Sequence, residues 1–225
     1  MPQMSCDCLG LLLLTPEEPI VTALETLYKG TQKPVAFVDE TFELEEEWTF
    51  YIVAASIIMP HRLDTVREAL LDCNGRRPLH AGPMAHLGDV LTLQAATEVI
   101  ANEQDGLDIV VCSPIADDDL HADRARARAL GHLAVTLQHA FATDVFVIDH
   151  RALEPLNALD RRTFSDLRRG GLLTRETRVH HCRPSEEPLL GLADVLAWSY
   201  RQDYLNKNTL WFDPLRDQTV IQILT

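Results

Sequence analysis

The chain alternates between short runs that are apolar at every position and longer segments whose apolar residues recur every three or four positions. Continuous apolar runs are typical of strands buried on both faces, and the longer spacing is typical of helices with one buried face. The predicted strands cover residues 34–39, 49–59, 107–115, 144–149 and 178–182. The predicted helices cover residues 62–73 and 88–102, a stretch from about 119 to 140, and a stretch that Pro188 opens. This alternation predicts an α/β fold whose mixed sheet is covered by helices on both faces.

The polar stretches between these elements are predicted to be connections, at residues 41–47, 76–83 and 150–177. After Asn206 the pattern weakens, and the chain ends on the apolar segment Val220–Leu224. This segment fits a docking tail, an edge strand or an oligomer contact, and the last of these would make the protein a homodimer.

The N-terminal part carries a helix start at Thr15-Pro16-Glu17-Glu18, with Thr as the N-cap, Pro in the first turn and Glu completing a capping box. The helix is expected to continue to about Lys29 and to stop at Gly30. Residues 1–33 are therefore predicted to form a helical leader packed on a main domain of residues 34–225.

Three acids interrupt segments that are otherwise apolar. Asp39 and Asp149 each end a predicted strand, and Asp194 lies inside the apolar helical stretch Leu189–Trp198. Burying an ionised carboxylate is costly unless a cation or hydrogen bonds compensate its charge. The acids therefore predict one shared cation, although a buried Asp that is bonded to backbone or to a distant Arg would also fit. Oxygen ligands without a His or Cys set favour Mg²⁺ or Mn²⁺.

Several other classes of site are excluded or disfavoured by the sequence. Five cysteines without a Cys-x-x-Cys pair do not form a disulfide framework or a zinc knuckle, and the nine histidines lack zinc-ligand spacing. Neither a glycine-rich phosphate loop nor a Gly-x-Ser-x-Gly elbow is present. The apolar runs reach about ten residues against the ~20 of a membrane helix, and no basic residue precedes the first of them. We therefore expect a cytoplasmic protein that does not enter a membrane.

Charge is distributed unevenly along the chain. The net charge of −14 argues against a surface that binds nucleic acid non-specifically. Residues 161–183 nevertheless contain seven arginines against Asp166 and Glu176. Two interpretations stay open for this segment: a local groove for RNA or DNA, or a solvated Arg-rich helix and loop.

Five short motifs occur in a familiar order: Phe37–Thr41, the strand Tyr51–Ile58, Leu79-His80, Val147–Asp149 and Leu192–Asp194. In this order they resemble the domain-of-unknown-function-3800 family, whose fold is grouped with the ribonuclease-H-like nucleases. The resemblance spans about residues 34–204. It implies a ribonuclease-H-like fold and a nuclease that hydrolyses phosphodiesters by a two-metal mechanism with Mg²⁺ or Mn²⁺.

The resemblance also implies roles for individual residues. The metal-ligating, catalytic acids would be Asp39, Glu40, Asp149 and Asp194. Asp39 would bridge two ions, with Asp149 and Asp194 completing one ion each. The substrate would be bound by Thr41, His80, Arg161, Arg168 and Arg169. Because neighbouring residues of a regular strand point to opposite faces, Glu40 would reach the site of Asp39 only if the strand ended or bulged there.

Two positions depart from the family pattern. Thr41 replaces a Ser and keeps the hydroxyl, whereas Pro78 stands where the family has a Glu before Leu-His. Two other functions stay open, and the missing carboxylate favours the first of them. The first is a catalytically inactive ribonuclease-H-like protein that binds a protein or nucleic-acid partner, and the second is a hydrolase of small phosphoesters with the same metals.

Overall fold

The computed structural model describes residues 23–42, 50–103, 107–119 and 122–225. Residues 1–30 and 31–225 form two separate compact units. In the first unit the described part is helix α1 (Ala23–Lys29), which ends where the sequence predicts. The predicted helix start at Thr15 and most of the predicted turn at 41–47 lie outside the described residues.

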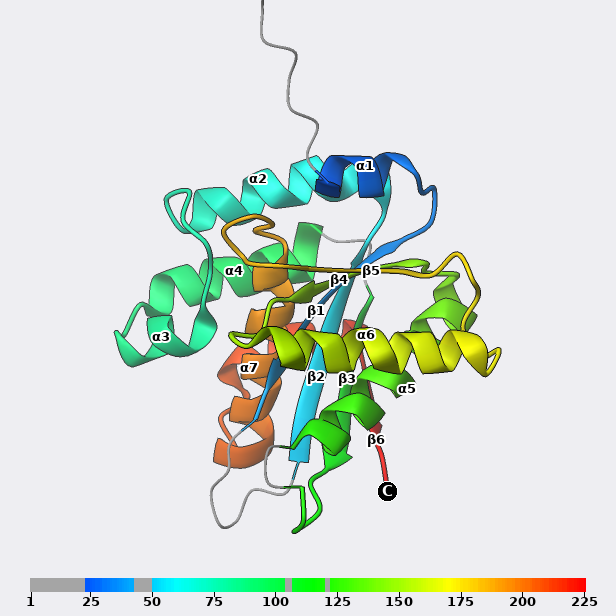
Figure 1. Cartoon of the computed structure of the whole chain (residues 1–225). Coiled ribbons are helices and arrows are strands. Elements are labelled where there is room, and N and C mark those ends of the chain that lie inside the picture. Colours follow the sequence, from blue (N-terminus) through cyan, green and yellow to red (C-terminus); the bar gives the residue numbers. More distant parts are fainter. Residues whose placement is uncertain (1–22, 43–49, 104–106, 120–121) are drawn as a thin grey trace, which may run out of the picture. The chain divides into compact units, whose positions relative to one another are not determined.

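The second unit is built on a six-stranded mixed sheet in the order β5-β4-β1-β2-β3-β6 (Figure 1). The strands are β1 (Val35–Thr41), β2 (Phe50–Ile58), β3 (Asp108–Pro114), β4 (Val145–Asp149), β5 (Arg178–Cys182) and β6 (Thr219–Ile223). Strand β2 is antiparallel to both β1 and β3, whereas β4 is parallel to β1 and to β5. This arrangement confirms the predicted α/β class and is consistent with a ribonuclease-H-like fold.

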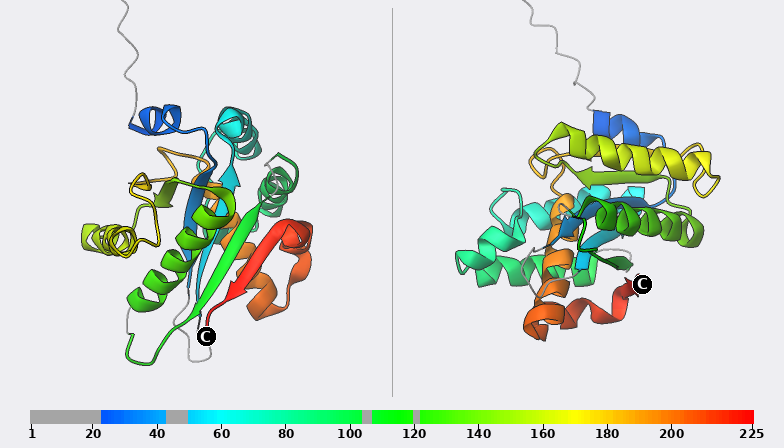
Figure 2. Two further views of the ribbon diagram at one scale, coloured as in Figure 1. Left: turned by 90° about the vertical axis from the view of Figure 1, so that its right-hand side faces the viewer. Right: turned by 60° about the horizontal axis from the view of Figure 1, so that its bottom comes forward.

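Helices cover both faces of the sheet, as the continuously apolar strands require. The helices are α2 (Leu63–Cys73), α3 (Ala81–His86), α4 (Val90–Glu103), α5 (Asp123–Phe141), α6 (Glu154–Arg169) and α7 (Leu190–Asn206). Helix α7 packs on β1 and β2, with α3 and α4 against it, and α2 packs on α4. Helix α5 packs on the other face of β2 and β3, with α6 beside it (Figure 2).

Two predicted connections are helical in the structure. Helix α6 occupies most of the stretch 150–177, and its buried residues are Asn157, Asp160 and Phe164. Because two of these three inward residues are polar, the segment lacks the apolar spacing by which a helix is recognised. The predicted loop 76–83 ends earlier than expected, because helix α3 begins at Ala81. Pro83 lies in the first turn of this helix, where its missing N–H costs no helical hydrogen bond.

The C-terminal segment forms an edge strand, one of the three alternatives that the sequence leaves open. Two 3₁₀ helices, Thr209–Trp211 and Asp213–Gln218, lead into β6, which pairs in parallel with β3. Among the helices of the described ranges, none has the length and apolar character needed to cross a lipid bilayer.

Candidate active site

Two of the three predicted acids are brought together by the pairing of β1 with β4. These strands are parallel neighbours, and the last residues paired between them are Val38 and Ile148. The next residues are Asp39 and Asp149, so that both carboxylates lie at the carboxyl edge of the sheet. Ligand crevices of open α/β sheets lie at this edge.

Helix α7 supplies the third acid. From Leu190 to Tyr200 every residue of α7 is buried except Asp194, which is partly exposed. The backbone N–H of Ala81, at the start of α3, donates a hydrogen bond of 2.9 Å to Asp194 Oδ2. His80 lies beside it, with Nδ1 4.0 Å from the same oxygen. The Leu79–Ala81 segment therefore holds both His80 and the Asp194 carboxylate in place.

Gly191 allows this segment to approach α7 closely. A Cβ at position 191 would lie 2.8 Å from Leu79 Cβ, well inside van der Waals contact. A glycine weakens a helix but leaves room for another element to approach.

Gly191→Ala is expected to destabilise the protein by about 1–3 kcal/mol, because the backbone around Leu79 must move to relieve the clash. For a chain of this size the melting temperature should fall by roughly 2–12 °C. Gly131→Ala in α5 is the matched control, since its Cβ would meet Leu167 and Thr163 at an ordinary 3.6 Å. Thermal unfolding should show no loss for the control, and equal losses for both variants would contradict the close approach at Gly191.

The three acids line one cavity of about 370 Å³. Its lining includes the predicted residues Asp39, Glu40, Thr41, His80, Asp149 and Asp194. Asp39 and Asp149 each accept a hydrogen bond from the next backbone N–H, at 2.7 and 2.8 Å. Within the described residues, no Lys or Arg lies within ion-pair distance of Asp39, Asp149 or Asp194. Their negative charge therefore has no Lys or Arg partner within the described part of the chain.

This charge arrangement raises the pKa values of all three carboxyls. Burial, followed by repulsion from Asp194 and the other acids, raises the pKa of Asp39 well above its usual value. Burial raises the pKa of Asp194 to about 6, although the hydrogen bond from Ala81 opposes the shift. Burial and the nearby Glu40 raise the pKa of Asp149. The cavity favours any cation or proton that lowers this charge.

The acids are not preassembled as a coordination sphere. Among the described residues, no group of three or more His, Cys, Asp or Glu side chains stands in an arrangement that could hold a metal ion. Each of the three acids gives one oxygen to a backbone N–H. Their carboxylates would therefore have to rotate toward one another before they could share an ion.

Glu40 differs from the other acids because it faces the opposite side of the sheet. Strand β1 continues through Glu40 in regular register, with Asp39 opposite Ala54 and Glu40 opposite Val53, so neither bulge nor strand end brings the two carboxylates together. The Glu40 carboxylate forms an ion pair of 2.5 Å with Arg126. Although Glu40 reaches the rim of the cavity, its charge is compensated by a buried guanidinium, and the expected ligand role finds no support in this geometry.

Arg126 is the centre of a buried network behind the cavity. The guanidinium donates two hydrogen bonds to Asp160, at 2.9 and 2.8 Å, and a third to the Tyr51 hydroxyl at 3.1 Å. His181 Nε2 lies 3.2 Å from the Asp160 carboxylate. Arg126 is only 2% exposed, so its guanidinium is buried within the fold.

The structure does not bring the predicted arginines to the cavity. Arg161 pairs with Glu154 within α6, and Arg169 pairs with Asp166. Arg168 donates to the carbonyl of Thr177, directly before β5 begins. Since β5 is parallel to β4, this is the edge of the sheet opposite Asp149. The solvated-helix interpretation of the Arg-rich segment therefore describes these residues better than a substrate groove does.

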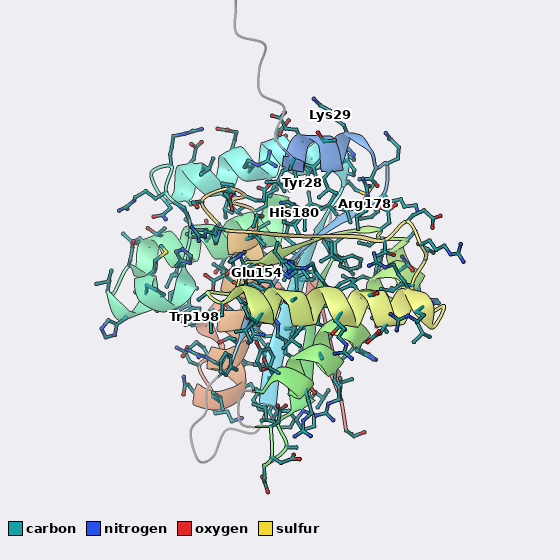
Figure 3. The ribbon with its side chains drawn as sticks, viewed as in Figure 1. Tyr28, Lys29, Glu154, Arg178, His180 and Trp198 are labelled. Carbon is teal, nitrogen blue, oxygen red and sulfur yellow. The ribbon has the colours of Figure 1, made fainter. Side chains whose placement is uncertain are left out.

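Five cavity residues were not predicted as site residues: Phe42, Gly82, Pro83, Trp198 and Arg201. Trp198 and Arg201 follow Asp194 at positions i+4 and i+7 of α7, so the three share one face of the helix. Figure 3 labels Trp198 on this helix. This spacing is visible in the sequence, but the apolar residues around it conceal which face of α7 is open.

Comparisons with known proteins add no assignment. No protein-family model matches the chain, and no curated protein sequence matches it. The resemblance to the domain-of-unknown-function-3800 family stays a prediction that rests on the order of its motifs.

Proposed function

We propose that the protein is a divalent-metal-dependent phosphodiester hydrolase that acts on nucleic acid at the cavity of Asp39, Asp149 and Asp194. One observation carries the proposal. Three carboxylates from three separate elements line one cavity, and none of them has a Lys or Arg partner among the described residues. Buried charges without such partners are typical of metal and catalytic sites.

The donor set fits hard cations, because it consists of carboxylate oxygens. Asp39, Asp149 and Asp194 would hold Mg²⁺ or Mn²⁺, and the bound ions would supply an activated water and stabilise the leaving oxygen. His80 is half exposed at the mouth of the cavity, with its ring beside Asp194. Its imidazole is suited to carry a proton between the cavity and solvent. Thr41, at the end of β1, offers a hydroxyl that can donate to a substrate oxygen.

Mn²⁺ is expected to bind at neutral pH and to raise the melting temperature by about 5–10 °C at a hundredfold excess over its Kd, since such binding adds about 2.7 kcal/mol. The increase should disappear near pH 5, because protons compete with the ion for Asp194, whose pKa lies at about 6. Thermal unfolding with and without Mn²⁺ across this pH range checks the prediction, together with calorimetry and an assay of oligonucleotide hydrolysis with EDTA as the blank. Absence of both binding heat and hydrolysis at neutral pH would reject the proposal.

A second function, a catalytically inactive relative that binds a partner, is favoured by one specific observation. Glu40 is held by Arg126, and Pro78 occupies the position of the family's Glu, so two carboxylates of the family pattern are not offered to a metal. The same calorimetry separates the two functions, because an inactive binding protein has no need of Mn²⁺. A small-phosphoester hydrolase would bind Mn²⁺ but would bind oligonucleotides without a steep dependence on salt.

A further inference from the structure

Two aromatic side chains and a cation form part of the cavity wall: Phe42, directly after β1, and Trp198 and Arg201, on α7. Phe42 is 39% exposed, and its ring stacks on Tyr51 with centroids 5.1 Å apart and planes 15° apart. Trp198 lines the cavity from α7 and packs its ring against Trp211. Arg201 follows one turn later on the same face of the helix. The buried rings beneath Phe42 and Trp198 fix these side chains, so the wall has a defined shape.

We propose that this wall is a nucleotide subsite and that the substrate is single-stranded nucleic acid. An unpaired base would stack on the exposed ring of Phe42 at the end of the sheet, and the phosphate next to the scissile one would bind the Arg201 guanidinium. This inference rests on the proposed function, because it names the substrate of the same cavity.

The positions of the charged residues match such a substrate. Asp194 and Arg201 are seven residues apart on α7, which corresponds to about 10 Å along the helix axis. A phosphate bound to Arg201 would therefore be a different phosphate from the one held at the acids. The two could be neighbouring phosphates of one strand. Among the described residues that line the cavity, Arg201 contributes the permanent positive charge. Its planar guanidinium can bind a phosphate with two hydrogen bonds.

The size of the cavity favours a single strand over a duplex. A volume of about 370 Å³ is at the lower end for small-ligand sites and suits one nucleotide rather than a base pair. In a duplex both faces of each base are covered by neighbouring base pairs, so Phe42 has no face to contact. Unpaired bases expose these faces, and proteins bind them on aromatic side chains.

The test is fluorescence anisotropy with a short labelled single-stranded oligonucleotide and a hairpin duplex of the same composition, in Ca²⁺ at neutral pH. The single strand should bind at least tenfold more tightly. Phe42→Ala should weaken single-strand binding about tenfold, the usual effect of losing one stacked base, whereas Phe42→Tyr should retain it. Arg201→Gln should weaken binding and lower the salt slope by about one phosphate contact, whereas Arg201→Lys should keep that slope.

Arg162→Gln and Leu153→Ala serve as matched controls, because both side chains are exposed and neither lines the cavity. Equal affinity for duplex and single strand, or unchanged binding in both Phe42→Ala and Arg201→Gln, would overturn the subsite. Mn²⁺ calorimetry and Mn²⁺-dependent hydrolysis of an oligonucleotide by the unaltered protein are measured separately. If both persist while the subsite fails, the proposed function stands. If both are absent while single-strand binding follows the expected pattern, the hydrolase is rejected and the subsite is retained.

Discussion

Asp194→Asn is expected to abolish Mn²⁺ binding and hydrolysis while it raises the melting temperature of the metal-free protein at neutral pH. The loss of rate should be on the order of 10³-fold or more, since a bound metal supplies several kcal/mol and each ~1.4 kcal/mol is a factor of ten. The gain in stability follows from the charge of the carboxylate, which burial and the neighbouring acids disfavour.

The sign of the stability change follows from the pKa of Asp194, which is about 6 in the folded protein against the usual 3.8. An acid whose pKa is raised on folding binds protons more readily in the folded state, so the free energy of unfolding falls as the pH rises between these values. A shift of about two units corresponds to about 3 kcal/mol at neutral pH. Asn removes the charge, and its side-chain oxygen can still accept the hydrogen bond from Ala81.

Thermal unfolding between about pH 4 and pH 8 in EDTA measures this effect. Unaltered protein should lose stability through this range, and the difference in favour of Asp194→Asn should grow as the pH rises. Asp72→Asn is the matched control, because it removes the same charge from an exposed side chain on α2. A lower melting temperature for Asp194→Asn at neutral pH would show that the Asp194 charge is compensated in the folded protein.

The convergence of the three acids could be predicted in part because it depends on local patterns. An apolar strand that ends on Asp and an Asp within an apolar helix are visible without knowledge of the fold. Whether their two strands are neighbours was left open by the sequence, and the structure shows that β1 and β4 pair in parallel. The alternation of side chains along a strand also predicted that Glu40 would face away from Asp39 unless the strand ended or bulged there. In the structure the strand is regular, and Glu40 does face away.

Other parts of the site depend on contacts between distant segments and could not be predicted. Arg126 and Asp160 lie 34 residues apart, and each looks like a solvated helical residue until the two helices pack together. The same ion pair explains why α6 was not predicted. The inward residue Asp160 interrupts the apolar spacing by which a helix is recognised in a sequence. The many arginines of residues 161–183 suggested a groove that binds phosphates. Composition alone, however, does not show toward which edge of the sheet these side chains lie. Helix α6 leads away from the carboxyl edge of the sheet, and therefore carries Arg168 away from the acids.

Arg126→Met is expected to destabilise the protein by about 3–5 kcal/mol, the usual result of removing one partner from a buried ion pair. Met fills much of the space of Arg126, but it leaves the carboxylates of Glu40 and Asp160 without their cation. For a chain of this length the melting temperature should fall by roughly 6–20 °C. Arg124→Met, two residues earlier on α5, is the matched control. Its side chain is exposed and pairs with Asp118 at the surface, so the loss should not exceed about 1 kcal/mol.

The pH dependence distinguishes the lost ion pairs from a simple packing defect. Although burial raises the pKa of Asp160, the hydrogen bonds from Arg126 and His181 lower it to about 2. An acid whose pKa is lowered on folding contributes stability above its unfolded value, and this contribution is lost as the pH falls through the folded value. The difference between the unaltered protein and Arg126→Met should therefore be largest at neutral pH and smaller below about pH 4, where the orphaned carboxylates become protonated. A packing defect would leave the same difference at both pH values. Adding Asp160→Asn to Arg126→Met should recover part of the lost stability at neutral pH, because one unpaired charge is removed.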